Sequence, residues 1–129
     1  MAEENTRLRN REEFLCKLLI PYIKPLDSLI KSPKQLTIIQ WAEVEENINK
    51  LYNNFTLRLK EQFPSFTNND LQVCCLIKLR ITVSDIAKIL NISPASVSKR
   101  KQRIKEQIIK ELGDNFDKSQ LIDIWIWEY

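Results

Sequence analysis

Apolar residues recur every three or four positions along most of the chain, which is the spacing of amphipathic helices. The first such segment predicts a helix over residues 3–20. Its apolar positions are Leu8, Phe14, Leu15, Leu18, Leu19 and Tyr22. Pro21, Pro25 and Pro33 follow, and proline interrupts a helix because it lacks the amide hydrogen and clashes with the preceding turn. We therefore expect at most a short helix over residues 25–31, inside a jointed connector.

A longer periodic segment predicts one helix over residues 37–63. Its apolar positions are Trp41, Val44, Ile48, Leu51, Phe55, Leu59 and Phe63. Thr37 and Gln40 have the spacing of a capping box, in which each side chain binds a backbone amide at the start of the helix. Pro64 ends the segment. We expect the apolar stripe to pack against the C-terminal part of the chain or against another subunit.

The predicted elements become shorter in the C-terminal half. Thr67 and Asp70 form a second start signal, and the LQVCCLIKL run after them is typical of a helix buried on most sides. The segments ITVSDIAKILN and ISPASVSKRKQRIKEQIIKELG predict two more helices, the second ending at Gly113. The last segment predicts a helix over residues 117–128, although its DIWIWEY alternation also fits a strand. The residues expected to cover the core there are Leu121, Ile122, Trp125 and Ile126.

The composition favours an all-α, cytoplasmic protein. One glycine in 129 residues is too few for the turns of hairpins and sandwiches. No apolar run reaches the roughly 18–20 residues of a membrane span, and the charged start MAEENTRLRNREE does not resemble a secretion signal. We therefore expect this segment to make no membrane contact.

The residue types that most enzymes need are missing. The chain has no histidine and three cysteines, Cys16, Cys74 and Cys75, so neither zinc-ligand spacing nor a Cys–His pair can form. The cysteines fit small core residues in a reducing compartment. The sequence has no glycine-rich phosphate loop and no nucleophile–base pair at motif spacing. We expect no catalytic residues, no metal site and no cofactor.

Positive charge is concentrated in residues 65–112. This block carries nine Lys and Arg against four Asp and Glu, whereas residues 1–64 carry ten against nine and residues 113–129 carry one against four. A basic block is typical of an element that binds a polyanion such as DNA. A solvated basic helix without a nucleic-acid partner would give the same count.

Part of this block has the residue pattern of a helix-turn-helix. Ala87 is small enough for two helices to cross closely, and Ile92 and Val97 supply buried positions in the turn and the second helix. Ser93 is an N-cap residue and Pro94 stands at the first helical position, where its missing amide costs nothing. Together these features predict a helix-turn-helix more strongly than any of them alone.

A helical wheel divides residues 94–108 into faces. Val97, Ile104 and Ile108 form the inner stripe, and a mixed polar face lies opposite. The predicted base contacts are Ser98, Lys99, Gln102 and Arg103. The predicted phosphate contacts are Ser84, Lys88, Ser96, Arg100, Lys101 and Lys105. This division follows because glutamine can read adenine, lysine and arginine can read guanine, and side chains at the edge of the helix lie nearer the DNA backbone.

Residues 65–112 resemble the LuxR/NarL-type helix-turn-helix, whose pattern is roughly L-T-x-x-E-x-x-V-L followed by S-x-x-I-A-x-x-L-x-I-S-x-x-T-V. The matching positions are Thr67, Asp70, Val73, Ser84, Ile86, Ala87, Leu90, Ile92, Ser93, Ser96 and Val97. The resemblance implies a four-helix DNA-binding domain whose base-facing positions are Ser98, Lys99 and Gln102. The chain departs from the pattern at Arg80 or Ile81, where the family usually has glycine, and in the acidic tail after the Leu-Gly ending.

Residues 33–64 are similar to the segment that precedes this domain in Bacteroidetes regulators, which often carry tetratricopeptide or other sensor repeats upstream. The likeness implies that the chain is the output piece of a larger sensor regulator.

The sequence thus predicts an all-α protein with two parts. Residues 1–64 form a helical, coiled-coil-like connector and possible dimerisation segment, and residues 65–129 form a LuxR-like helix-turn-helix domain. The predicted function is sequence-specific transcription regulation by a homodimer on double-stranded DNA, with helix 94–108 in the major groove and helix 37–63 or 117–128 at the dimer interface. The alternative is a protein-interaction module that uses the stripe of helix 37–63 and binds no DNA. The sequence makes no prediction about contact with RNA polymerase.

Overall fold

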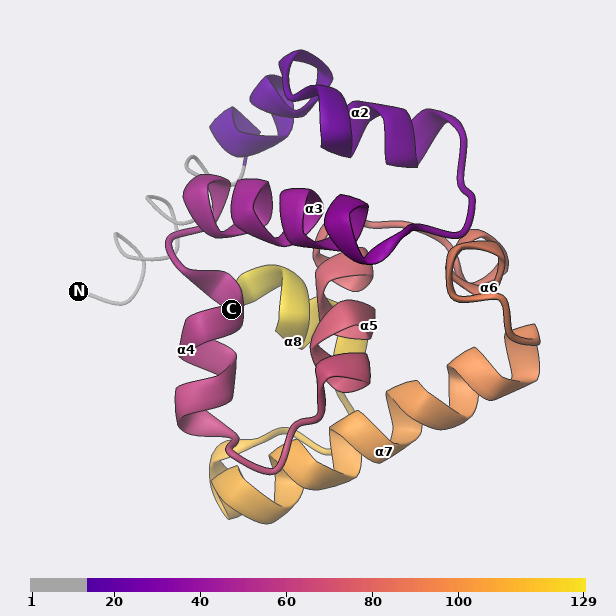
Figure 1. Ribbon diagram of the computed structural model, residues 1–129. Coiled ribbons are helices and arrows are strands. Elements are labelled where there is room, and N and C mark those ends of the chain that lie inside the picture. Colours follow the sequence, from indigo (N-terminus) through magenta and orange to yellow (C-terminus); the bar gives the residue numbers. More distant parts are fainter. Residues whose placement is uncertain (1–13) are drawn as a thin grey trace.

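Helices and the turns between them make up residues 14–129, which are the part of the chain that the computed structural model describes (Figure 1). The elements are η1 (Ile20–Tyr22), α2 (Lys24–Lys31), α3 (Ile38–Leu51), α4 (Phe55–Gln62), α5 (Asn68–Lys78), α6 (Val83–Leu90), α7 (Pro94–Leu112), η2 (Gly113–Asn115) and α8 (Ile122–Glu128). No β-strand occurs among these residues, so the predicted all-α class is confirmed. None of the described helices combines the length and the apolar character that crossing a membrane requires.

The first described residues are helical, as the periodicity predicts. Residues 14–19 form an α-helix that continues into the 3₁₀ turn η1. Leu8 and the rest of the predicted start lie outside the described residues. The short helix α2 begins at Lys24 with Pro25 in its first turn, where proline is tolerated. The predicted short helix over residues 25–31 is therefore confirmed, but its Leu26 and Leu29 are buried in the core of the molecule.

The single long helix predicted over residues 37–63 is wrong, because the chain breaks at Asn53 and Asn54. Both residues are left-handed, with φ of 52° and 57°, a region that asparagine tolerates better than most residues. The break is supported by Asn49, whose side-chain amide donates to Thr56 Oγ1 at 2.8 Å while its oxygen accepts from Thr56 N at 2.9 Å. The apolar stripe gave no sign of this break, because α3 and α4 bury their stripes in the same core.

Both predicted capping boxes form. At the start of α3, Thr37 N donates to Gln40 Oε1 at 3.0 Å and Gln40 N donates to Thr37 Oγ1 at 3.2 Å. At the start of α5, Thr67 N donates to Asp70 Oδ2 at 2.8 Å and Asp70 N donates to Thr67 Oγ1 at 3.2 Å. These two helices begin within one residue of their predicted starts because local side chains fix them.

One buried cluster extends through the molecule and centres on α5. Every residue from Val73 to Leu79 is buried, and the cluster continues from Ile20 at one end of the chain to Ile126 at the other. The described residues of both predicted parts, 1–64 and 65–129, therefore contribute to the same core. Cys74 and Cys75 lie inside it without a disulfide, and burial raises the pKa of both thiols well above its usual range.

The last helix, α8, covers one side of α5. It starts at Ile122, later than predicted, and buries Ile122 and Ile126 as expected. Leu121 is largely exposed, so its predicted place in the core is wrong. Trp125 packs against three aromatic rings, with centroid distances of 5.8 Å to Phe63, 6.2 Å to Phe116 and 5.0 Å to Tyr129, the C-cap residue of α8. In a helix Trp125 and Tyr129 are one turn apart, so their rings can stack, whereas in a strand they would lie about 13 Å apart.

Candidate nucleic-acid interface

Helices α6 and α7 are joined by a three-residue turn and pack directly on each other. Asn91 ends α6 in the left-handed conformation, with φ of 55°, and Ile92 N donates to Ala87 O at 3.0 Å. Ser93 then caps α7 by accepting from Ser96 N at 3.1 Å. Asparagine and serine are the residue types suited to these two positions, so the local sequence determines how α7 leaves α6.

The inner and outer faces of α7 are those that the helical wheel predicts. Val97, Ile104 and Ile108 are fully buried. The predicted base contacts Ser98, Lys99, Gln102 and Arg103 are all exposed. Within residues 14–129, the Lys99 ammonium has no hydrogen bond or ion pair. The polar face of α7 therefore points outward.

Gln102 has one neighbour on that face. Its Nε2 donates to Glu106 Oε1 at 3.4 Å, one turn further along α7. This bond is long for an amide donor, so the Gln102 amide can leave it at small cost. Glu106 also marks an end of the basic surface, because a carboxylate at that position would repel a phosphate.

Arg103 is partly engaged inside the molecule. Its Nη2 lies 3.0 Å from Oδ2 of Asp70, whose side chain is 3% exposed, whereas the Arg103 side chain is 55% exposed. The same carboxylate oxygen accepts the backbone amide of Thr67 in the capping box. Arg103 therefore joins α7 to the start of α5, and this role differs from the predicted base contact.

Lys101 is bound by α8. Its Nζ lies 3.0 Å and 2.9 Å from the two carboxylate oxygens of Asp123, and the Lys101 side chain is only 14% exposed. Its charge is thus neutralised within the chain, in contrast to the predicted phosphate contact. Residue spacing along α7 could not reveal this pair, because Asp123 comes from a different helix. The excess of acidic residues in residues 113–129 is the feature of the sequence that could have indicated a partner for a basic side chain.

The other predicted phosphate contacts differ in how exposed they are to solvent. Ser84 and Lys88 are exposed on α6, and Lys88 Nζ lies 3.6 Å from Asp85 Oδ1. Ser96 is partly buried and its hydroxyl accepts from Ser93 Oγ at 2.9 Å. Arg100 and Lys105 are partly buried at the edges of α7, and the charge of Lys105 contributes to the lowered pKa of Asp117 after the larger effect of hydrogen bonds from Ser119.

Two further cations of the basic block serve contacts that sequence reasoning missed. Lys78 is buried, and its Nζ donates to the carbonyl oxygens of Trp127 at 2.7 Å and of Ile126 at 3.4 Å. Arg80 lies over the Trp127 ring, with 4.3 Å from its guanidinium carbon to the ring centroid. Both therefore hold the C-terminal end of α8, where a cation also interacts favourably with the negative end of the helix dipole. Lys101 and Arg103 are also paired within the chain. The remaining cations of the block are Lys88, Lys99, Arg100, Lys105 and Lys110.

Arg80 also accounts for the departure from the glycine of the resembled pattern. It has φ of 60°, and its amide donates to Ile77 O at 2.8 Å in the turn between α5 and α6. An arginine thus occupies the left-handed position that glycine adopts with less strain. Its guanidinium on Trp127 offsets part of that strain, since such a contact stabilises by about 0.5–1 kcal/mol at an exposed site.

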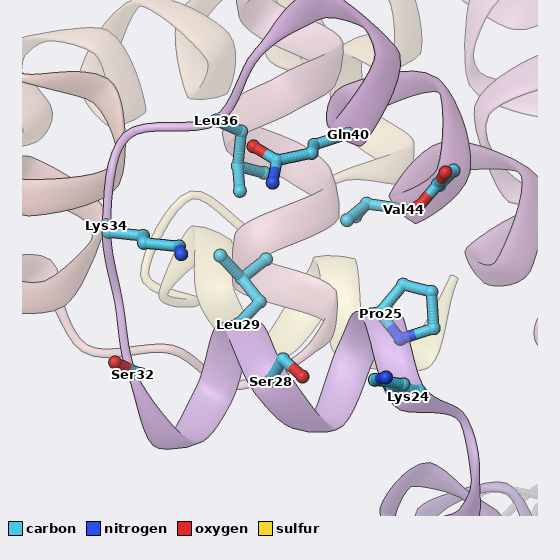
Figure 2. A pocket seen from close by; sticks show the side chains of 10 residues that line it. Lys24, Pro25, Ser28, Leu29, Ser32, Lys34, Leu36, Gln40 and Val44 are labelled. Carbon is cyan, nitrogen blue, oxygen red and sulfur yellow. The ribbon is translucent and has the colours of Figure 1, made fainter.

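A cavity of about 400 Å³ lies away from α7, between α2 and α3 (Figure 2). Leu29 and Val44 contribute apolar side chains to it, and Lys24 and Lys34 stand at its edge. Helices α4, α5 and α8 separate this end of the molecule from α7 (Figure 1). The cavity contains none of the predicted site residues, so it forms no part of the candidate interface.

Comparison of the chain with protein families, with curated proteins and with solved structures gives no significant match. The interface is therefore interpreted from its own side chains. Its centre is the outer face of α7 with Ser98, Lys99 and Gln102, and its edges carry Arg100 and Lys105.

Proposed function

We propose that the protein binds double-stranded DNA through α7, as a regulator with a LuxR/NarL-type helix-turn-helix. The observation that carries the proposal is the division of α7 into two opposite faces. Val97, Ile104 and Ile108 are fully buried on one side, while a small, mixed set of polar side chains is exposed on the other. A solvated basic helix has no need of this mixture of hydroxyl, ammonium and amide groups, whereas reading base edges does.

In this function α7 lies in the major groove and its outer face contacts base edges. Lys99 reads guanine through N7 or O6, and Gln102 reads adenine through a bidentate pair. Ser98 adds a hydroxyl that serves either base. Each well-formed base contact discriminates against the wrong base by about 1–3 kcal/mol, so two or three such contacts select a short half-site.

Phosphate contacts supply most of the affinity in this proposal. Lys88 and Ser84 on α6 and Arg100 and Lys105 on α7 are the side chains for that task. Lys101 stays with Asp123 and contributes little. With three phosphate-binding cations, the logarithm of the binding constant should fall with the logarithm of salt concentration with a slope of about −3.

The test is fluorescence anisotropy with a labelled duplex of random sequence at several salt concentrations. We expect measurable binding at low salt and a steep decrease as salt rises. Lys99→Ala should weaken binding, whereas the matched control Lys34→Ala should not, because Lys34 is an exposed lysine at the far end of the molecule. Negligible binding at low salt, or binding that is insensitive to salt, would contradict the proposal.

The burial of the apolar stripe argues against the alternative, a protein-interaction module. Such a module requires the apolar stripe of residues 37–63 to be free for a partner, but Val44, Ile48, Phe55 and Leu59 are buried within the chain. A partner helix could reach them only by displacing the core. We therefore do not propose that alternative.

A further inference from the structure

The helix before η1 and the turn itself present large apolar side chains to solvent. They are Phe14 at 62% exposure, Leu15 at 50%, Leu18 at 53%, Leu19 at 52% and Tyr22 at 86%. We call these five residues the N-terminal stripe. At 100° per residue they fall within an arc of about 140° on one side of the helix, so they form one continuous surface.

The opposite side of the same helix already packs against the protein. Cys16 Sγ donates to Leu51 O at 3.3 Å, and Ile20 is buried in the core. The helix is therefore apolar on two sides, with Lys17 on the arc of about 120° between Ile20 and Phe14. One apolar side is covered by the protein, and the other is a contiguous exposed apolar surface, which marks an interaction site.

We propose that a second copy of the chain covers the N-terminal stripe and forms an isologous homodimer. In such a dimer the same surface meets itself across a two-fold axis. The stripe contains no charged residue, so pairing it with itself brings no like charges together. Lys17 lies outside the arc and can keep its ammonium in water.

The exposed area suits a weak dimer. An aromatic side chain buries about 150–250 Å² in full, and with three half-exposed leucines the stripe offers roughly 500 Å² per copy. Two copies would together bury about 1,000 Å², the lower limit for a specific interface. The other large exposed apolar residues of the described chain are spread over α2, α3, α4 and the start of α8, with at most two on one element. They are Ile30, Ile38, Ile39, Leu57 and Leu121.

This interface lies within residues 1–64, the possible dimerisation segment, but differs from the two helices, 37–63 and 117–128, that the sequence suggested for the contact. The stripes of residues 37–63 and 117–128 are largely buried in the core of one chain. The N-terminal helix lies at the α2–α3 end of the molecule, and α7 lies at the other end (Figure 1). Pairing through the stripe therefore leaves α7 of each copy outside the interface.

The experiment is sedimentation velocity of the DNA-free protein over a range of concentrations, so that its result does not depend on the proposed function. We expect a concentration-dependent monomer–dimer equilibrium. Leu18→Glu should raise the dimer dissociation constant by at least about 30-fold, as loss of an interface hot spot does. The control Leu57→Glu, which changes an exposed leucine of α4, should dimerise like the original chain.

Far-UV circular dichroism checks that both variants keep their helices, and Tyr22→Ala provides a second variant that leaves the core untouched. A chain that stays monomeric at the highest concentration overturns the proposal. So does a Leu18→Glu variant that dimerises unchanged, or a Leu57→Glu variant that dissociates equally. Binding of a monomeric chain to anionic lipid vesicles, lost in Leu18→Glu, would assign the stripe to a membrane surface and also overturn it.

Discussion

Replacing Lys101 by alanine separates two roles that one lysine on a basic helix can have. A phosphate contact would make the variant bind all DNA sequences more weakly. The ion pair with Asp123, at 2.9 Å and 3.0 Å, indicates instead that Lys101 holds α8 against α7. We therefore expect Lys101→Ala to lower the stability of the fold while leaving the salt dependence of DNA binding almost unchanged.

The magnitude follows from the exposure of the pair. Exposed ion pairs contribute about 0.2–1 kcal/mol, and removing one partner of a fully buried pair costs about 3–5 kcal/mol. The side chains of Lys101 and Asp123 are 14% and 31% exposed, which places the pair between these limits. We expect the free energy of unfolding to fall by about 1–2 kcal/mol after solvent screening is allowed for. For 129 residues this corresponds to a melting temperature lower by about 3–7 °C.

Two measurements on the same variant test this prediction. Thermal unfolding followed by circular dichroism gives the stability change, and anisotropy at several salt concentrations gives the salt slope. Lys99→Ala is the matched control, because Lys99 is exposed and makes no ion pair within residues 14–129. It should leave the melting temperature unchanged and reduce DNA affinity.

The reverse substitution is equally informative. Asp123→Asn removes the charge that holds Lys101, so the ammonium can turn outward along its flexible stem. The salt slope should then become steeper by about 0.9. An unchanged melting temperature in Lys101→Ala, together with a slope shallower by that amount, would refute the reasoning and restore Lys101 as a phosphate contact.

Three further predictions address other parts of the molecule. Gln102→Ala should change which sequence is selected from a random duplex pool more than it weakens binding overall, and a uniform loss would contradict base reading. Asn54→Val should lower the free energy of unfolding in urea by about 1–2 kcal/mol, because a β-branched residue is strained at φ of 57°, whereas Asn54→Gly should not. Cys74 and Cys75 should resist a thiol reagent in the folded protein at pH 8 and react once it is unfolded, because burial raises their pKa; rapid reaction of either would show that the core opens.

Local signals in the sequence predicted most of the helix starts. Thr67 and Ser93 each stand one residue before a helix and accept an amide from its first turn, so the signal and the contact lie within four residues of each other. The outer face of α7 was predictable for a similar reason, because once the start of a helix is known, the direction of each side chain around its axis follows. The break at Asn53 was not, because apolar residues continue on both sides of it at helical spacing.

The partners of the basic side chains could not be predicted from spacing. Asp123 and Asp70 reach α7 from other helices, and Lys78 reaches carbonyl groups nearly fifty residues along the chain. A count of charges treats all these cations as available for a polyanion. The structure shows which of these cations are paired within the chain.

The position of α8 has a consequence for how the protein is made. Trp127 Nε1 donates to Ile77 O at 2.9 Å, so α8 closes over a helix that the ribosome completed about fifty residues earlier. Until Asp123 has been translated and has left the exit tunnel, α7 lacks its ion pair to α8. Contacts between distant segments form last, since closing a long loop is entropically costly. A growing chain can thus form the α6–α7 pair early, but α7 is fixed against α8 only after the segment that carries Asp123 has left the exit tunnel.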